Sequence, residues 1–221
     1  MNLKTKARHI TDALEAAYPD SGCMLDYEKP HELLFSVRLA AQCTDARVNI
    51  VTRDLYARYP TLAAFAAATV EEVEAIVRPC GLGHTKARDI VAAAKDLQTR
   101  FGGKVPDTME ELLSLPGVGR KTANLMLGDV FHKPAVVCDT HCIRITNLLG
   151  LTDSKNPAVV EKQLWAILDP ERSNDFCHRL VLHGRAVCVA RRPACGACAL
   201  APWCDYAKAE SKKAPKSKKG A

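Results

Sequence analysis

Leu115-Pro116-Gly117-Val118-Gly119-Arg120-Lys121-Thr122-Ala123-Asn124 decides the fold of this chain, because two helical patterns meet there. Thr108 and Glu111 have the spacing of a capping box, which predicts a short helix ending near Leu113. The Pro-Gly pair should end that helix, and Gly119 should let the backbone turn tightly into a second one. The result is two helices joined by a hairpin. The backbone N–H groups at the start of the second helix are suited to binding phosphate.

Lys121 lies in the first turn of the second helix, where the positive end of the helix dipole disfavours an ammonium ion. A lysine amine freed of its proton is a nucleophile suited to Schiff-base chemistry. The alternative role is a solvated lysine that only contacts phosphate. The residues around Lys121 leave both roles open.

The formal net charge of the 221 residues is +6 at pH 7, but it is unevenly distributed. Residues 208–221 hold six lysines and one glutamate, so five of the six net charges lie in this basic tail. The tail is rich in small and polar residues that bury little apolar surface, and we expect it to be disordered. DNA binding by the remaining residues would need a local basic stripe rather than bulk charge.

The composition also predicts where the protein acts. No apolar run is long enough to cross a membrane, and the chain opens on an acid-containing amphipathic pattern rather than on a signal or transit peptide. Ten cysteines without an export signal favour metal or cluster ligation over disulfides. We therefore expect a cytoplasmic protein, associated with the nucleoid if it is bacterial.

The chain reads as helical almost throughout, with no alternating strand pattern and no Asn-Gly hairpin signal. Lys86 precedes the cleanest helical face and reads as a surface lysine. That face consists of Ala87, Ile90, Val91, Ala94, Leu97 and Phe101. The prediction is an all-α protein of one large domain or two small ones.

Asp139 follows the apolar run 135–138 and precedes another helical pattern, which is the place of an N-cap. The helix dipole favours an ionised carboxylate at this position. Such a charge would suit the stabilisation of a nearby cation or the deprotonation of a lysine. Capping alone would also explain the residue.

Four cysteines near the C-terminus are separated by six, two and five residues: Cys188, Cys195, Cys198 and Cys204. Four thiolates this close in sequence suit Zn²⁺ or an iron–sulfur cluster. Zinc sites usually pair two Cys-x-x-Cys or Cys/His clips, and only one such clip is present, so the spacing favours a cluster. The remaining cysteines match no ligand pattern and are expected to be buried small hydrophobes.

Arg191 and Arg192 lie in the loop between Cys188 and Cys195. A metal that ties this loop down would order both arginines, and ordered guanidinium groups can hold a phosphate. The expected role of the metal is therefore structural, aligning basic residues on a phosphate-bearing partner.

Three motifs in order along the chain resemble endonuclease III, the helix-hairpin-helix family of DNA base-excision glycosylases with lyase activity. They are the decamer 115–124, Val137-Cys138-Asp139-Thr140-His141 and the C-terminal cysteines. The resemblance extends from about Ala7 to Tyr206. It implies a 4Fe-4S cluster on the four cysteines, Lys121 as the nucleophile and Asp139 as its partner.

The resemblance also implies an all-α fold of two helical domains with a DNA groove between them. Residues 23–133 correspond to a six-helix domain with the hairpin, and residues 1–22 with 134–207 to a discontinuous iron–sulfur domain. The implied partner is double-stranded DNA that contains oxidised pyrimidines or abasic sites. We expect the protein to bind it as a monomer.

Members of this family extrude the damaged nucleotide and fill the vacated stack with side chains from two loops. Gln42 and Leu82 are the matching residues, and the alternative roles are a surface glutamine and a core leucine. The chain departs from the family at Cys142, where a larger aliphatic residue is usual and could touch the flipped base. The implied DNA-binding residues are Gln42, Leu82, Gly117, Gly119, Arg120, His141, Arg191 and Arg192.

The predicted reaction is excision of an oxidised pyrimidine followed by β-elimination 3′ to the abasic site. One alternative is an adenine glycosylase of the same superfamily. Those enzymes place a glutamate where this chain has Arg38, and they lack the lysine that matches Lys121. The other alternative is a non-catalytic, metal-stabilised DNA-binding module.

Overall fold

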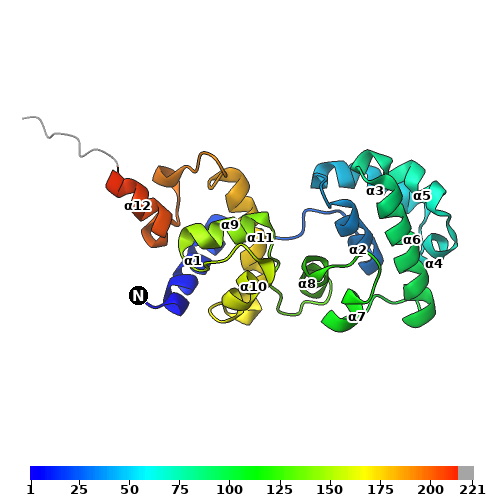
Figure 1. The fold of residues 1–221 in the computed structure, drawn as a ribbon, viewed down its shortest axis with the longest axis horizontal. Coiled ribbons are helices and arrows are strands. Elements are labelled where there is room, and N and C mark those ends of the chain that lie inside the picture. The colour runs from blue at the N-terminus through cyan, green and yellow to red at the C-terminus, as the bar shows by residue number, and fades with distance from the viewer. Residues whose placement is uncertain (214–221) are drawn as a thin grey trace, which may run out of the picture. The chain divides into compact units, whose positions relative to one another are not determined.

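A computed structural model describes residues 1–213 and consists, over that range, of helices and loops without a strand (Figure 1). The prediction of an all-α protein is confirmed. The chain forms two compact units: unit 1 comprises Met1–Gly22 and the chain from Pro134 on, and unit 2 comprises Cys23–Lys133. Within the described residues, no helix has the length and apolar character needed to cross a membrane.

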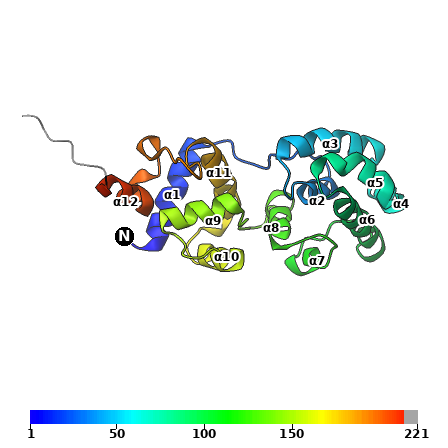
Figure 2. The same ribbon diagram turned by 45° about the horizontal axis from the view of Figure 1, so that its top comes forward.

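Unit 2 is built around its longest helix, α6. The elements of the unit are α2 (Pro30–Leu39), α3 (Asp45–Arg58), α4 (Leu62–Ala67), α5 (Val70–Val77), η1 (Arg78–Cys80), α6 (Gly83–Arg100), α7 (Met109–Leu113) and α8 (Arg120–Asp129). Helices α4 and α5 pack against α6 (Figure 2). The face of α6 that the spacing predicted is buried from Ala87 to Leu97, while Phe101 follows the helix as a half-buried residue.

An aromatic cluster fills the core of unit 2 beside α4. The ring centroid of Phe65 lies 4.9 Å from that of Phe35 and 5.2 Å from that of Tyr59. Both phenylalanines are almost completely buried. Large rings bury much apolar area each, so this cluster adds to the hydrophobic stabilisation of the aliphatic core around it.

Threonine caps start several helices of unit 2. At α5, the Thr69 hydroxyl accepts a hydrogen bond from Glu72 N–H, and the Glu72 carboxylate accepts one from Thr69 N–H. At α7, the Thr108 hydroxyl accepts from Glu111 N–H, as predicted for the helix before the hairpin. Each cap satisfies N–H groups that the helix itself leaves without partners.

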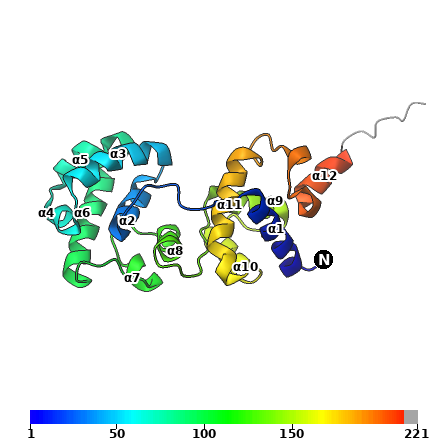
Figure 3. The ribbon, with the colours of Figure 1, turned by 180° about the vertical axis from the view of Figure 1, so that it is seen from behind.

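Unit 1 is assembled from both ends of the chain. Its elements are α1 (Leu3–Ala17), α9 (Thr140–Leu149), α10 (Pro157–Trp165), η2 (Pro170–Arg172), α11 (Ser173–Ala186), η3 (Cys195–Ala197), η4 (Ala201–Trp203) and α12 (Asp205–Lys213). Helix α11 packs against both α1 and α9 (Figure 3). The core between them contains Ile10, Leu14, Ile145, Leu149, Phe176 and Leu180.

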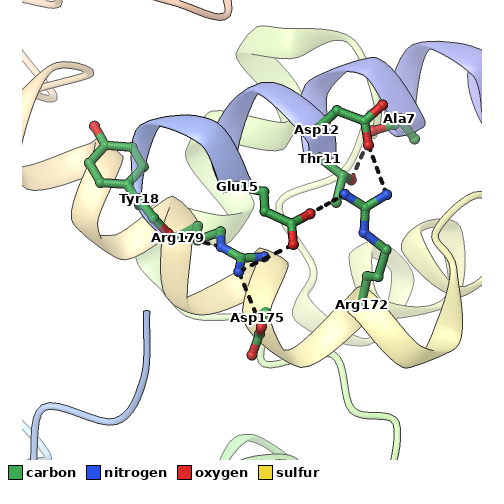
Figure 4. A network of polar contacts seen from close by, with 8 residues as sticks. All are labelled: Ala7, Thr11, Asp12, Glu15, Tyr18, Arg172, Asp175 and Arg179. Carbon is green, nitrogen blue, oxygen red and sulfur yellow. Dashed lines mark hydrogen bonds and ion pairs between the residues drawn. The ribbon is translucent and has the colours of Figure 1, made fainter. Parts of the chain in front are cut away.

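Two arginines fasten α1 to the segment around α11 (Figure 4). Arg172 donates to Asp12 at 2.8 Å and to Glu15 through its other terminal nitrogen. Arg179 is only 4% exposed, and its Nε donates to the carbonyl oxygen of Tyr18 at 3.1 Å. The acidic partners of Arg172 are about half exposed, so those pairs add little stability. The buried bond of Arg179 holds the end of α1 in place.

The prediction of a disordered tail from residue 208 is wrong for Lys208–Lys213, which belong to α12. Lys208 N–H donates to the carbonyl oxygen of Cys204 at 3.1 Å, and Asp205 at the start of the helix pairs with Lys6 at 2.8 Å. Composition shows only that the tail has no core of its own. It does not show that a docked first turn can be extended by good helix formers such as alanine, lysine and glutamate. Residues 214–221 lie outside the described residues.

Candidate active site and metal centre

The hairpin between α7 and α8 requires glycine at position 117. Its φ is +74°, a left-handed backbone that side chains rarely adopt. A Cβ there would also lie 2.9 Å from Asp89 Cβ and 3.0 Å from Arg38 Nε. Arg38 of α2 and Asp89 of α6 form an ion pair of 2.8 Å. The hairpin therefore rests on a pair that joins two other helices of unit 2.

The start of α8 is open. Gly119 is its N-cap and supplies no side chain, so the N–H groups of the first turn are not covered by a capping group. The φ of Gly119 is −103°, and a Cβ there would meet nothing within 4 Å. The expectation that Gly119 is needed for a tight turn is therefore wrong, and its effect is to leave the helix end unobstructed. Arg120 and Lys121 follow as the first two residues of α8, and both are exposed.

Gln42 and Leu82 stand on two loops of unit 2 and share an unusual backbone. The φ of Gln42 is +57° and that of Leu82 is +51°, and both residues are exposed. The alternative role of Leu82 as a core leucine is excluded, because it is 58% exposed. A left-handed backbone costs a residue with a Cβ about 1–2 kcal/mol, and strain of this kind gathers at functional sites.

Lys86 is buried, which corrects its interpretation as a surface lysine. Its side chain is inaccessible, and Nζ donates to the carbonyl oxygens of Leu39 (2.8 Å) and Cys80 (2.7 Å). These carbonyls end α2 and η1, where helix geometry leaves C=O groups without partners. Burial lowers the pKa of Lys86. The charge of the residue suggested solvent, and the sequence gives no sign of carbonyls brought from two distant segments.

Asp139 caps α9, as predicted. Its Oδ1 accepts a hydrogen bond from Cys142 N–H at 2.6 Å, and the residue is half-buried. The apolar run 135–138 that precedes it is buried and fixes the entry to the helix. Asp139 belongs to unit 1, whereas Lys121 belongs to unit 2, so each unit supplies one of the two predicted catalytic residues.

Cys142 points into the core of unit 1. It is 0% exposed, and hydrogen bonds with the thiols of Cys138 and Cys177, together with burial, raise its pKa. The expectation that this side chain could touch a flipped base therefore does not hold. Among the cysteines without a ligand pattern, Cys80, Cys138, Cys142 and Cys177 are buried as expected, while Cys23 and Cys43 are half-buried.

The four C-terminal cysteines line one small cavity in unit 1. The other lining residues are mostly apolar, and none of those described carries a carboxylate. Within residues 1–213, no group of three or more Cys, His, Asp or Glu side chains could hold a metal ion. Four soft sulfur donors around one apolar cavity are a donor set that fits a thiolate-ligated metal centre.

Two side chains that the sequence did not connect with metal contact these thiols. Arg144 of α9 donates to Cys188 Sγ at 3.5 Å. His183 Nε2 lies 3.4 Å from Cys198 Sγ, and its Nδ1 lies 3.1 Å from the Tyr18 hydroxyl. Burial and the charge of Arg144 lower the pKa of His183. Polar neighbours of this kind surround and orient metal-bound sulfur. These two contacts could not be predicted from the sequence, because α9 and α11 bring Arg144 and His183 to the cysteines only in the folded structure.

Arg191 and Arg192 are exposed on the loop that follows α11. Backbone bonds shape this loop: Ala194 N–H donates to the Val187 carbonyl at 3.0 Å, and Arg192 N–H donates to the Val189 carbonyl at 3.3 Å. The two arginines are thus presented to solvent on a turn beside the cysteine cavity.

His141 lies differently from the two arginines. Its Nδ1 is 2.2 Å from the place where a Cβ of Gly184 would stand, so the ring rests against the backbone of α11. The same nitrogen lies 3.4 Å from a terminal nitrogen of Arg144. The residue is half-exposed, and its contact with DNA stays a prediction.

Comparison with known proteins identifies the class to which this fold and site belong. Residues 35–170 match the family model described as HhH-GPD superfamily base excision DNA repair protein. The fold is shared with a thermostable thymine-DNA glycosylase, at a TM-score of 0.83 and 19% identity over 93% of this chain and 98% of that one. The chain is therefore a member of the HhH-GPD superfamily.

Closer relatives narrow the assignment. Endonuclease III of Synechocystis sp. PCC 6803 is 42% identical over 207 residues, 93% of this chain and 94% of the relative. Endonuclease III of Escherichia coli K12 is 38% identical over 203 residues, covering 92% and 96%. A solved non-covalent endonuclease III–DNA complex matches with a TM-score of 0.89 at 38% identity, covering 96% of this chain and 100% of that one. A trapped endonuclease III–DNA covalent intermediate matches equally well. Within the superfamily, this chain belongs to the endonuclease III family.

Proposed function

We propose that the protein is a DNA glycosylase and abasic-site lyase of base excision repair. It removes oxidised pyrimidines from double-stranded DNA and cleaves the strand 3′ to the abasic site. The observation that carries the proposal is Lys121, an exposed amine beside the uncapped N-terminus of α8 in a chain of the endonuclease III family. The solved covalent intermediate of a relative supports an enzyme that bonds to its substrate.

The chemistry follows from one amine. Lys121 Nζ attacks C1′ of the damaged nucleotide, and the bond from C1′ to the base breaks, so that the base departs with the electron pair and takes up a proton. The sugar ring opens and leaves a protonated Schiff base between C1′ and Nζ. Loss of the C2′ proton then drives β-elimination, in which the C3′–O bond breaks with the phosphate as leaving group. Water hydrolyses the Schiff base and restores the lysine.

Asp139 is the proposed partner of this amine. Its place at the N-terminus of α9 holds the carboxylate through the bond from Cys142 N–H. A carboxylate near C1′ would stabilise the positive charge that develops on the sugar as the base leaves. It could also accept the proton that the lysine ammonium must lose before it attacks.

The remaining predicted residues would hold the DNA. The open N-terminus of α8 offers N–H groups to a phosphate, with Arg120 beside it. Gln42 and Leu82 would fill the stack that the flipped nucleotide leaves, which offsets part of the few kcal/mol that flipping costs. Arg191 and Arg192 would contact backbone phosphates, which add affinity without reading the sequence.

The four cysteines fit a 4Fe-4S cluster, given their soft donors, their shared cavity and the polar groups that contact their sulfurs. When bound, the cluster would supply iron for the four thiolates to ligate, which would tie residues 188–204 together. The consequence for DNA binding is an ordered turn for Arg191 and Arg192. We propose this structural role for a protein that acts as a monomer on the chromosome, in the cytoplasm.

Arg38 argues against an adenine glycosylase. In this chain it pairs with Asp89 beneath the hairpin, so it serves the packing of unit 2 where those enzymes carry a glutamate. The second alternative, a non-catalytic DNA-binding module, would use Lys121 only as a phosphate contact and would leave Asp139 no role beyond capping α9.

Borohydride trapping tests the proposal. The protein is mixed with a duplex that holds one oxidised pyrimidine, and borohydride reduces the Schiff base to a stable amine. We expect a protein–DNA adduct and, without borohydride, a strand cut 3′ to the lesion. Release of adenine from a duplex with adenine opposite oxidised guanine, without a trapped adduct on the oxidised pyrimidine, would favour the adenine glycosylase. Tight binding with neither adduct nor cut would favour the binding module.

A further inference from the structure

The buried amine of Lys86 joins two segments that are far apart in the sequence. Leu39, whose carbonyl accepts one bond from Nζ, is the last residue of α2, and Cys80, whose carbonyl accepts the other, is the last residue of η1. Both bonds are short, at 2.8 and 2.7 Å, and the side chain has no access to solvent. Two of the three N–H donors of the buried ammonium are thus held by backbone carbonyls, which offsets part of the cost of burying the charge.

The two carbonyls lie just before the loops that hold Gln42 and Leu82. Gln42 follows Leu39 by three residues, and Leu82 follows Cys80 by two. Each of these loop residues has a positive φ and an exposed side chain. Lys86 also donates its own N–H to the carbonyl oxygen of Leu82, at 3.0 Å. One residue of α6 therefore contacts the base of the first loop and both ends of the second.

A further contact brings the same loops together. The thiol of Cys43, the residue after Gln42, lies beside the thiol of Cys80. Burial, together with this neighbour, raises the pKa of the Cys80 thiol to about 11. The Cys80 thiol is therefore uncharged near neutral pH and acts as a packing group. The ammonium of Lys86 thus links the carbonyls of Leu39 and Cys80, and the two thiols pack beside the same loops.

We propose that Lys86 is a positioning residue that holds the loops of Gln42 and Leu82 in one fixed spacing, so that both side chains can enter the DNA stack together. The inference rests on the proposed function, because it concerns the step in which the nucleotide leaves the stack. Lys86 does not touch the reacting atoms. Its proposed effect is on the free energy of the state in which the nucleotide is flipped out and Gln42 and Leu82 occupy the stack.

This role predicts a dependence on the substrate. Wedge residues matter when a paired, stacked base must be extruded, and they matter much less when the nucleotide is already outside the helix. Lys86→Met keeps most of the side-chain volume but removes all three N–H donors, which leaves the two carbonyls unpaired. Lys95→Met on the exposed face of α6 is the matched control for loss of one lysine. Ile90→Val on the buried face is the control for a small loss of stability.

The experiment compares single-turnover base excision of one oxidised pyrimidine in two contexts, paired in a duplex and placed in an unpaired bulge. For Lys86→Met we expect the rate on the paired lesion to fall on the order of tenfold or more, and the rate on the bulged lesion to change by less than about threefold. Borohydride trapping on a preformed abasic site opposite a gap should stay near the wild-type level. Both control variants should keep the wild-type ratio of the two rates.

The outcomes separate the possibilities. Equal losses in both contexts, or the same change of ratio in Ile90→Val, would show that Lys86 only stabilises the fold and would overturn the proposal, as would no loss in either context. If Lys86→Met does not fold, Lys86→Gln, which keeps two N–H donors on a shorter side chain, must show the same direction of change for the proposal to stand. Failure of the wild-type protein to trap on an abasic site would instead refute the proposed function itself.

Discussion

Gly117 carries two separate constraints on one residue. Its φ of +74° disfavours any side chain, and the space that a Cβ would fill is already occupied by Asp89 and Arg38. Gly119, two residues further, has an ordinary φ and open space around it. The two glycines cannot be distinguished in the sequence, because both lie in the turn between α7 and α8. Only the packing of α2 and α6 beneath the hairpin separates them.

This difference gives a prediction about stability. Gly117→Ala should lower the free energy of unfolding by about 2–3 kcal/mol, since it adds left-handed strain and a close contact with Asp89. Gly119→Ala is the matched control and should cost less than about 1 kcal/mol, the scale of a poorer N-cap. Urea denaturation followed by circular dichroism measures both values. Equal losses in the two variants would contradict the packing of the hairpin on the Arg38–Asp89 pair.

The second prediction concerns the nucleophile. Lys121→Gln removes the amine from an exposed position on α8, so the fold should be unchanged. Base excision and borohydride trapping should both disappear, because the same nitrogen performs both steps. Gel analysis of trapped adducts measures the result. Covalent trapping by Lys121→Gln would mean that another amine is the nucleophile.

Asp139→Asn is the companion variant and should behave differently. Asparagine is as good an N-cap as aspartate, so the bond from Cys142 N–H and the start of α9 should persist. Only the negative charge is lost, and base excision should fall on the order of a hundredfold. Cleavage of a preformed abasic site should suffer less, because no departing base has to be stabilised. Equal losses on both substrates would argue that Asp139 acts on the lyase step as well.

At the scale of elements, the features that could be predicted are local ones. The Thr69 and Thr108 caps, the N-cap at Asp139 and the buried face of α6 each depend on residues within a few positions of one another. The contacts of Lys86 and Arg144 could not be predicted, because their partners come from other segments. The helix over Lys208–Lys213 was missed for a related reason: its first turn is docked by Lys6 from the other end of the chain.

The loop between Cys188 and Cys195 allows a specific prediction about DNA binding. Arg192→Ala removes an exposed guanidinium on this loop and should weaken binding to damaged and undamaged duplexes alike. The slope of log affinity against log salt concentration should fall by about 0.9, the contribution of one phosphate contact. Lys155→Ala, an exposed lysine of unit 1, is the control for loss of one positive charge. A loss confined to damaged DNA would mean that Arg192 reads the lesion.

At the scale of the whole molecule, the two units differ in how the chain builds them. Unit 2 is one continuous segment with an aromatic core around Phe65. Unit 1 joins the two ends of the chain, and Arg172 and Asp12, which pair across it, are 160 residues apart in sequence. The helical class follows from local patterns, whereas the docking of α1 on α11 depends on these distant contacts and on the cavity that the four cysteines share.

The last prediction follows from this division. The four cysteines all lie in unit 1, so if they hold the proposed cluster, removal of its iron should loosen residues 188–204 and α12 while α6 keeps its protection. Hydrogen exchange read by mass spectrometry, before and after oxidation and chelation of the iron, measures the change in each segment. The amides of α6, buried among Ile90, Ala94 and Leu97, serve as the internal control. Equal loss of protection in α6 would show that the units unfold together.

Metal analysis tests the iron–sulfur assignment separately. Stoichiometric zinc without iron or sulfide, in protein purified without oxygen, would refute that assignment and leave the division into units untouched.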